Sequence, residues 1–207
     1  NEKTNLFAIS EFANKYYQKN LWETVEGGQI GLSYLKERGY TEDTIKKFQI
    51  GYCLKNKDAF SKHAVDSKFE REYLIKSGLS IKSNIKLIDR FRERIIFPIH
   101  NFTGRVLGFG GRTLNAQEKS KYLNSPENNI YHKSKVLYGI FFAKQDISKR
   151  NNCFIVEGYT DVISLYQKGI TNVVSSSGTS LTKDQIKLIS RFTKNITLLF
   201  DGDNAGI

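Results

Sequence analysis

Two short apolar runs, each ending on acidic residues, constrain the fold more than any other feature of this sequence. Residues 153–156 are Cys-Phe-Ile-Val and precede Glu157, whereas residues 196–200 are Ile-Thr-Leu-Leu-Phe and precede Asp201 and Asp203. Short, partly β-branched apolar runs are typical of strands that are buried on both faces of a parallel α/β sheet. Because such sheets collect functional groups at the carboxyl ends of their strands, we expect the three acids to lie at one edge.

These acids form a ligand set of hard oxygen atoms without histidine or cysteine. Such a set suits Mg²⁺ or Mn²⁺, which commonly bind phosphate oxygens, and it indicates phosphoryl or nucleotidyl transfer. Asp161 is a candidate fourth ligand, although an acid in the first turn of a helix is equally well explained by the helix dipole. The alternative is that these acids have no catalytic or metal-binding role: Glu157 would be an ordinary strand-end carboxylate, and residues 201–203 would form a turn.

Positive charge is concentrated in the middle of the chain. The net charge is +11, and lysine and arginine outnumber aspartate and glutamate by 14 to 5 within residues 82–150. The corresponding counts are 13 to 11 within residues 1–81 and 5 to 5 within residues 151–207. A basic block beside a neutral, acid-bearing sheet would attract phosphate on one side and hold metal on the other. A basic surface that serves only solubility is the alternative.

Apolar periodicity and capping residues predict several helices. A helix is expected over residues 5–19, with Ser10 and Glu11 able to interrupt or cap it, and Gly27-Gly28 is expected to break the helical pattern. Ser134 is expected to cap a later helix that runs to Ser148. The remaining predicted helices cover residues 30–38, 41–48, 58–65, 69–76, 159–167 and 183–192.

Strand-like patterns alternate with these helices. Arg90, Arg92 and Arg94 alternate with other residues, so one extended strand would place all three guanidinium groups on one face. Further strands are expected over residues 51–54, 85–88, 95–100, 105–112 and 172–175, with a hairpin loop at residues 101–104. The βαβαβ order from residue 153 predicts a parallel sheet. The loop Ser175–Thr179 would help to position phosphate or would simply be a capped turn.

The acidic motifs resemble a known signature. Glu-Gly-Tyr-Thr-Asp at residues 157–161, followed by Asp-Gly-Asp at residues 201–203, is similar to the Toprim signature of primases, topoisomerases and some nucleases. Residues 89–99, 104–112, 121–127 and 131–133, in this order, resemble the catalytic core of bacterial replicative primases. Residues 34–39 and 51–52 fit the same pattern, so the likeness covers essentially the whole chain.

This resemblance implies an α/β protein with two parts. Residues 1–149 would form a mixed α+β basic subdomain, helical over residues 1–81 and α+β over residues 82–149. Residues 150–207 would form a Toprim subdomain with a Rossmann-like parallel sheet, truncated at its C-terminal end. A sheet truncated in this way would leave an uncovered edge.

The resemblance also implies an activity and its residues. The family synthesises short RNA primers on a single-stranded DNA template from ribonucleoside triphosphates, with Mg²⁺ or Mn²⁺ as cofactor. Catalysis and metal binding would fall to Glu157, Asp201 and Asp203, with Asp161 as a further candidate ligand. Binding of nucleotide or nucleic acid would fall to Arg90, Arg92, Arg112, Lys121, Asn124 and Lys133.

We expect the sequence to be an excised piece, because it contains no methionine. Zinc would bind only in a missing N-terminal module, and the replicative helicase would contact a C-terminal region absent here. Without the further acids of the family, this piece would bind metal weakly or not at all and would make no primers. Template-directed ribonucleotide addition by this piece would contradict that expectation.

The cysteine content and the hydropathy indicate which cellular location to expect. Cys53 and Cys153 form no C-x-x-C pair, which excludes a zinc ribbon and favours a reducing cytoplasm. No apolar run is long enough for a membrane span, so we expect no membrane partner. The two alternative functions are a Toprim-type nuclease or topoisomerase-like enzyme, and a non-enzymatic single-stranded DNA-binding module.

Overall fold

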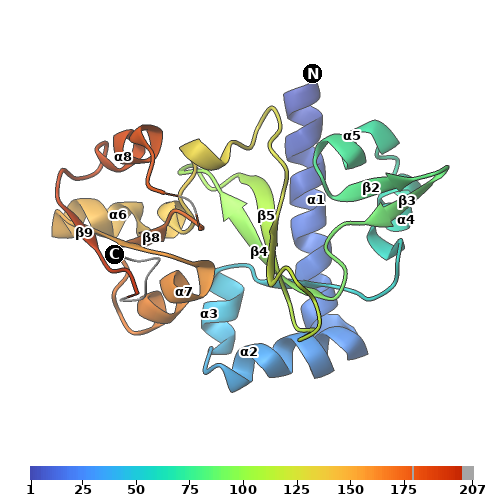
Figure 1. The fold of residues 1–207 in the computed structure, drawn as a ribbon, viewed down its shortest axis with the longest axis horizontal. Coiled ribbons are helices and arrows are strands. Elements are labelled where there is room, and N and C mark those ends of the chain that lie inside the picture. Colours follow the sequence, from blue (N-terminus) through green and yellow to red (C-terminus); the bar gives the residue numbers. More distant parts are fainter. Residues whose placement is uncertain (179, 202–207) are drawn as a thin grey trace. The chain divides into compact units, whose positions relative to one another are not determined.

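The protein is mixed α/β and divides into two compact units. The structure is a computed structural model that describes residues 1–178 and 180–201. Unit 1 comprises residues 1–98 and 106–131, and unit 2 comprises residues 99–105 and 132–207. Figure 1 shows the elements of both units. None of the described helices is long and apolar enough to cross a membrane. The predicted subdomain boundary at residues 149 and 150 stays a prediction.

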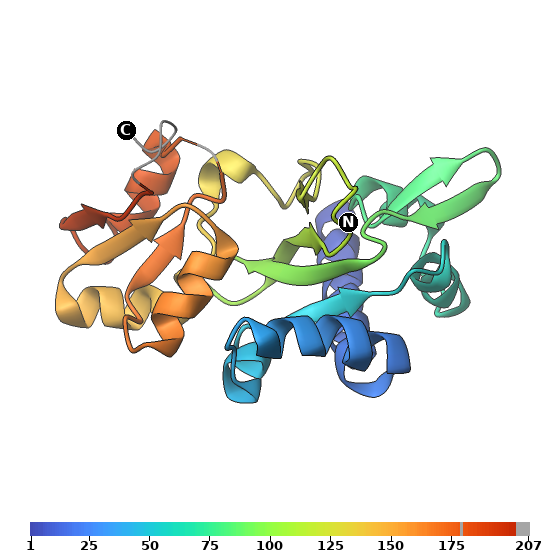
Figure 2. The same cartoon turned by 60° about the horizontal axis from the view of Figure 1, so that its bottom comes forward.

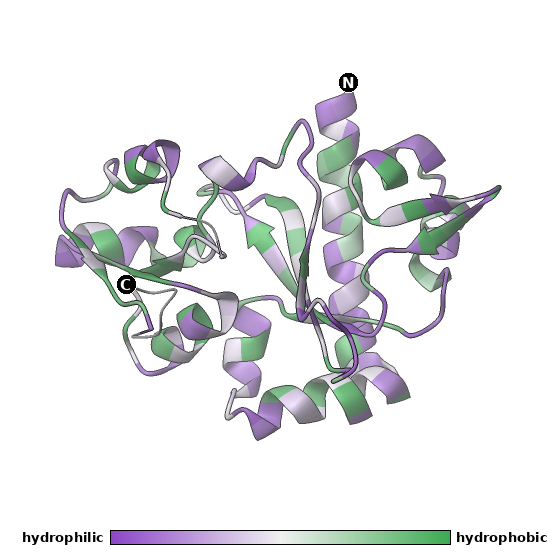
Figure 3. Cartoon of the chain, in the orientation of Figure 1, coloured by the Kyte–Doolittle hydropathy of each residue, from purple (hydrophilic) through white to green (hydrophobic). Residues whose placement is uncertain are grey.

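Helix α1 (Glu2–Glu23) is the longest element of unit 1. Its buried apolar side chains recur at helical spacing, and Figure 3 shows apolar and polar residues alternating along it. They are Leu6, Ile9, Ala13, Tyr17 and Leu21. The helix lies so close to strand β1 (Gly51–Cys53) that a Cβ atom on Gly51 would lie 2.6 Å from the backbone carbon of Tyr17. Only glycine permits this approach.

The helix expected over residues 5–19 is confirmed, and neither Ser10 nor Glu11 interrupts or caps it. The helix continues through both residues because Ser10 is buried within it and a carboxylate oxygen of Glu11 accepts a hydrogen bond from the Val106 amide at 3.1 Å. Gly27 and Gly28 do not end the helical pattern either, since they open a π-helical segment, η1 (Gly27–Leu32). Helix α2 (Ser33–Glu37) follows directly.

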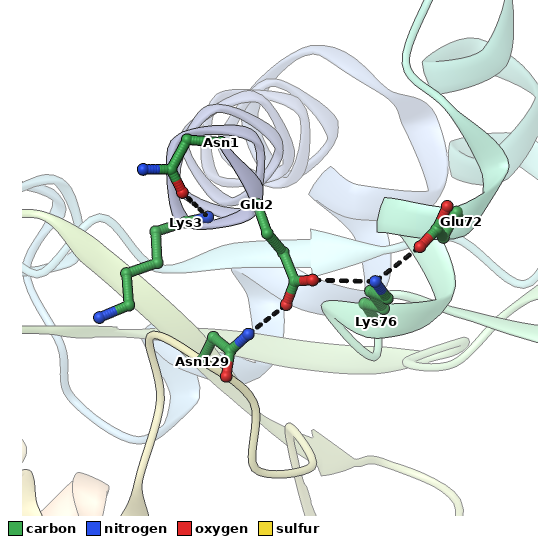
Figure 4. A network of polar contacts seen from close by, with 6 residues as sticks. All are labelled: Asn1, Glu2, Lys3, Glu72, Lys76 and Asn129. Atoms are coloured by element: carbon green, nitrogen blue, oxygen red, sulfur yellow. Dashed lines mark hydrogen bonds and ion pairs between the residues drawn. The ribbon is translucent and has the colours of Figure 1, made fainter.

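The remaining helices of unit 1 are short and agree with the sequence pattern. Helix α3 (Glu42–Lys47) is capped by Thr41, whose side chain accepts a hydrogen bond from the Thr44 amide. Helices α4 (Ala59–Asp66) and α5 (Arg71–Lys76) match the two short helices expected before residue 77. The N-terminal end of α1 and helix α5 are joined at the surface. Lys76 pairs with Glu72 at 2.6 Å and with Glu2 at 2.9 Å, and Glu2 also accepts from Asn129 (Figure 4).

An antiparallel sheet with strand order β1-β4-β5-β6 and a separate hairpin complete this part of the chain. Its other strands are β4 (Arg94–His100), β5 (Val106–Thr113) and β6 (Tyr122–Asn124). The loop between β4 and β5 turns at Gly104, which has a φ of +95° that favours glycine. The predicted antiparallel sheet and this hairpin loop are confirmed. Strands β2 (Ser80–Ser83) and β3 (Lys86–Asp89) form the hairpin, and β2 was not predicted.

The predicted row of three arginines on one strand face is wrong. Residues 90–93 form a turn between β3 and β4, and Glu93 has a positive φ of 54°. Only Arg94 belongs to a strand, and it is almost completely buried. Its guanidinium donates to the carbonyl oxygens of Gly111, Ser120 and Lys121 at 3.2 to 3.3 Å. Arg94 therefore holds β5 and the segment before β6 together.

Unit 2 contains a parallel sheet with strand order β8-β7-β9, which confirms the βαβαβ prediction. The strands are β7 (Cys153–Val156), β8 (Val173–Ser175) and β9 (Ile196–Leu198), which lie side by side in Figure 2. Helix α7 (Tyr159–Gln167) connects β7 to β8, and α8 (Lys183–Ile189) connects β8 to β9. A core cluster joins these strands to α6 (Ile140–Arg150) and α8.

The predicted helix from Ser134 to Ser148 begins later than expected. Residues 133–135 form a single 3₁₀ turn, η2 (Lys133–Lys135), and α6 starts only after Gly139, whose φ is +87°. Gln185, which is fully buried, donates to the carbonyl oxygens of Lys133 at 3.2 Å and Val136 at 2.9 Å. Because these carbonyl groups are used by a side chain of α8, residues 133–136 stay outside the helix.

Asp89 fixes the start of α4 from the end of β3. Its buried carboxylate accepts from the amides of Phe60 and Ser61, both at 2.8 Å, and from the Ser61 hydroxyl at 2.6 Å. Burial raises the pKa of the Asp89 carboxyl, and these hydrogen bonds act in the opposite direction. The carboxylate therefore serves as the N-terminal cap of a helix that has no side-chain cap of its own.

We predict that Asp89→Ala lowers the free energy of unfolding of unit 1 by about 3 kcal/mol, because it leaves two buried helix amides without acceptors. Asp66→Ala, at the exposed C-terminal end of the same helix, should change it by less than about 0.5 kcal/mol. Urea unfolding followed by the fluorescence of Trp22, the single tryptophan, measures both. Equal stability of the two variants would contradict this role of Asp89.

Candidate functional site

The structure brings Glu157 and Asp201 together at the carboxyl edge of the parallel sheet. Glu157 follows β7 directly, and β9 continues beside it, because the Leu199 amide donates to the Ile155 carbonyl at 2.9 Å. The Asp201 amide then donates to Oε1 of Glu157 at 3.0 Å. Two acids 44 positions apart in the sequence are thus neighbours because their strands pair in parallel.

The backbone of Glu157 is held from strand β8. Its carbonyl oxygen accepts from the Ser175 hydroxyl at 2.7 Å and from the Gly178 amide at 3.3 Å. Ser175 is fully buried, and its hydroxyl also accepts from the amide of Ser177. Sequence reasoning treated this loop as a capped turn or a phosphate-positioning loop and missed its contact with Glu157. A serine that ends a buried strand and precedes another small polar residue was the available signal.

Asp161 has a structural role at the start of α7. Its Oδ2 atom accepts from the Gly158 amide at 3.0 Å, so this carboxylate satisfies the backbone amide at the N-terminal end of that helix. Asp203, the third predicted acid, lies outside the described residues. Among residues 1–178 and 180–201, no group of three or more histidine, cysteine, aspartate or glutamate side chains forms a metal cluster. The described part of the edge therefore contributes two neighbouring acidic residues, which are joined through the Asp201 amide and the Glu157 carboxylate.

Arg90 lies in unit 1 with part of its guanidinium unused. Its Nη2 atom donates to the Asn124 carbonyl oxygen at 3.4 Å, whereas its buried Nε atom has no hydrogen-bond partner among the described residues. Burial lowers the pKa of Arg90. A buried N–H donor without an acceptor is costly, so the described residues leave the Arg90 guanidinium incompletely satisfied. Arg90 and Asn124 are thus brought together.

Arg112 and Lys121 line a second feature of unit 1, a cavity of about 330 Å³. The Arg112 guanidinium lies 4.8 Å from the ring centroid of Tyr34, and Arg38 lies 5.8 Å from the same ring. The cavity has the size of a small-ligand site. Tyr34 and Arg38 were noticed in the sequence as part of a family pattern but were not assigned to the site. The other lining residues are Thr113, Leu114, Asn115, Ala116 and Glu118.

The two remaining predicted basic residues lie elsewhere. Arg92 is exposed in the turn before β4, so it does not share a strand face with Arg90. Lys133 belongs to unit 2, in the 3₁₀ turn η2, and its carbonyl oxygen accepts from Gln185. Of the predicted binding residues, the structure therefore pairs Arg90 with Asn124 and Arg112 with Lys121.

Two protein-family models match most of the chain. The model of the N-terminal domain of the DNA primase catalytic core matches residues 16–144, which is more than half of the chain. A Toprim-like model matches residues 154–207, the part that carries both Glu157 and Asp201. The two matches follow each other along the chain in the order that the resemblance in the sequence implied.

Individual relatives with similar sequences are also DNA primases. The DNA primase of Halalkalibacterium halodurans is 42% identical over 203 residues, which are 97% of this chain and 34% of the relative. The DNA primase of Escherichia coli K12 is 40% identical over 206 residues, which are 99% of this chain and 35% of the relative. The chain thus spans about a third of the length of the curated relatives it matches.

Solved structures show the same fold. The RNA polymerase domain of the Mycobacterium tuberculosis primase has a TM-score of 0.91 at 34% identity, with 98% of this chain and 68% of that chain covered. A primase catalytic domain bound to single-stranded DNA has a TM-score of 0.91 at 40% identity, with 99% and 63% covered. Because a model of this family matches more than half of the sequence, the chain belongs to the DNA primase catalytic core family.

Proposed function

We propose that this chain supplies the nucleotidyl-transfer part of a DNA primase, a DNA-dependent RNA polymerase that makes short RNA primers on single-stranded DNA during replication. The observation that carries the proposal is that relatives called DNA primase match 97% and 99% of the chain at 42% and 40% identity. The meeting of Glu157 and Asp201 at the edge of the Toprim-like sheet supports it.

The acids at this edge are proposed to hold Mg²⁺ or Mn²⁺. Glu157 uses only Oε1 for the Asp201 amide, so its Oε2 atom and the exposed Asp201 carboxylate have no hydrogen bond to other described residues. Free carboxylate oxygens fit a hard divalent cation. Asp203 is proposed as a further ligand, and Asp161 retains one oxygen atom that its helix cap does not use.

The bound cation would activate the primer 3′-hydroxyl and neutralise the departing pyrophosphate. The contribution of the chain itself is to hold the Glu157 carboxylate beside the backbone of Asp201. The carbonyl of Glu157 is bonded to Ser175 and Gly178, and its carboxylate accepts from the Asp201 amide. A carboxylate that is already held in place needs little reorganisation during the reaction. Catalysis at such a site therefore depends on alignment and charge compensation more than on a protein side chain that acts as a base.

The basic residues are proposed to bind the triphosphate and the nucleic-acid strands. Arginine offers a planar fork to phosphate oxygens, and lysine offers a mobile charge suited to a substrate that arrives and leaves. The cavity beside Arg112 and Lys121 supports the assignment of these two residues. The complete proposed set is Arg90, Arg92, Arg112, Lys121, Asn124 and Lys133.

The proposed partners are the single-stranded DNA template, the RNA primer and ribonucleoside triphosphates. One structural relative was solved with single-stranded DNA and another with a double-stranded DNA oligomer that carries a single-stranded overhang, which supports DNA as a ligand. A replicative helicase is a further proposed partner. The two cysteines are free and buried, which accords with a proposed cytoplasmic location. The nuclease, topoisomerase and simple DNA-binding alternatives gain no support from these relatives.

A chimaera tests the proposed activity, because the chain covers only a third of its relatives. This chain would replace the matching third of the Halalkalibacterium halodurans primase. We predict that the chimaera incorporates ribonucleotides into RNA on single-stranded DNA with Mg²⁺, and that Glu157→Gln lowers the rate by about 100-fold or more through loss of a metal ligand.

Asp184→Asn is the matched control, because it removes the same charge from an exposed residue of α8 in the same unit. It should leave the rate within about twofold. An inactive chimaera beside an active parent enzyme would count against the proposed function. Unchanged synthesis by the Glu157→Gln chimaera would remove Glu157 from the mechanism.

The basic cavity allows a separate test with the isolated chain. Arg112→Ala should weaken binding of fluorescently labelled single-stranded DNA and lower the slope of log affinity against log salt by about 0.7, the value for one lost phosphate contact. Lys119→Ala, an exposed residue of the same segment that does not line the cavity, is the matched control and should bind like the unmodified chain. Equal salt slopes for the two variants would exclude Arg112 as a phosphate contact.

A further inference from the structure

Unit 2 contains an open cavity of about 700 Å³ that the proposed reaction does not use. Lys144, Gln145, Ser148 and Lys149 of helix α6 line one part of it. Phe102, from the loop between β4 and β5, and Phe192, which follows α8, line the rest. The volume is in the range of pockets that enclose a small ligand or a few side chains.

This cavity lies at the opposite edge of the parallel sheet from Glu157 and Asp201. Ser148 and Lys149 precede β7, and Phe192 precedes β9, so these residues lie beside the amino ends of both strands. Hydrogen bonds join the two segments there: the Cys153 amide donates to the Asn195 carbonyl at 2.9 Å. The acids follow the same strands at their carboxyl ends, so the cavity is a separate site.

The cavity combines an apolar floor with positive charge. Phe102 and Phe192 are half-buried and pack against the core cluster of unit 2. Lys149 and the adjoining Arg191 are exposed, and neither forms an ion pair within the described residues. None of the described residues that line the cavity is acidic. An occupant that fits this surface carries negative charge and at least one apolar side chain.

The ring geometry favours a peptide over a nucleic-acid strand. The Arg191 guanidinium lies 4.4 Å from the ring centroid of Phe102, so one face of that ring is covered, and the ring is also packed against the core. A base that stacks needs an open aromatic face. Lys144 is engaged as well, because its Nζ atom donates to the Phe102 carbonyl at 2.7 Å. Gln145 and Ser148 remain to bond a peptide backbone.

We propose that this cavity is a docking site for an acidic peptide segment of a partner protein, with one aromatic or aliphatic side chain of the peptide packed against Phe192. Lys149 and Arg191 pair with the acidic residues of the segment. Charge complementarity and the half-buried phenylalanines set the specificity, as in other interfaces that combine an apolar anchor with a charged rim.

The test is fluorescence anisotropy with the purified chain and three labelled probes. They are an aspartate-rich peptide with a single phenylalanine, the same peptide with serine in place of the phenylalanine, and oligothymidylate. The phenylalanine peptide should bind more tightly than the serine peptide. The double variant Lys149→Gln, Arg191→Gln should weaken its binding by about fivefold, the value of two exposed ion pairs.

Lys168→Gln is the matched control, because this exposed lysine of unit 2 lies outside the cavity, and it should bind the peptide like the unmodified chain. Thermal unfolding of all variants verifies that they are folded. Absence of peptide binding at millimolar concentration, equal binding of the two peptides, or an unaffected double variant would each overturn the proposal. Oligothymidylate binding that is tighter than peptide binding and is lost in the double variant would overturn it in favour of a nucleic-acid site.

Discussion

Parallel pairing of β7 with β9 is the constraint on which the candidate catalytic edge depends. The pairing continues past the last residue of β9 through the Leu199 amide and ends with the Asp201 amide on the carboxylate of Glu157. On the other side of β7, the Ser175 hydroxyl from β8 holds the carbonyl of the same glutamate. Because both neighbouring strands bond to one residue, the position of that residue follows from the sheet itself and not from a flexible loop.

Buried polar side chains that serve backbone groups hold the surrounding elements in place. Asp89 caps α4, Arg94 binds three carbonyl oxygens, and Gln185 binds two. Each of these groups is satisfied by the backbone, which makes it costly to remove and leaves it little capacity for a ligand. The basic residues of unit 1 therefore divide into two kinds. Arg94 is structural, whereas Arg90 keeps a buried donor without a partner among the described residues.

Much of unit 2 could be predicted because its signals are local. Apolar runs, glycines and caps define β7, α7 and β9, and parallel topology then places Glu157 beside Asp201. The wrong secondary-structure predictions arise where contacts or backbone conformations that the local sequence does not reveal determine the structure. Residues 90–93 alternate like a strand, but Glu93 adopts a positive φ, which no side-chain pattern indicates. The segment after Ser134 stays outside α6 because Gln185, some fifty positions later, binds its carbonyl groups. Strand β2 was missed because most of its residues are polar and exposed.

The central claim is that Glu157 and Asp201 form one metal-binding edge. Crystals of the chimaera with the Halalkalibacterium halodurans primase, grown with Mn²⁺, provide the most direct measurement, an anomalous difference map. The account predicts a manganese peak within direct coordination distance of carboxylate oxygens from both residues. A map with manganese bound elsewhere, or with the two carboxylates turned to opposite sides of the sheet, would contradict it.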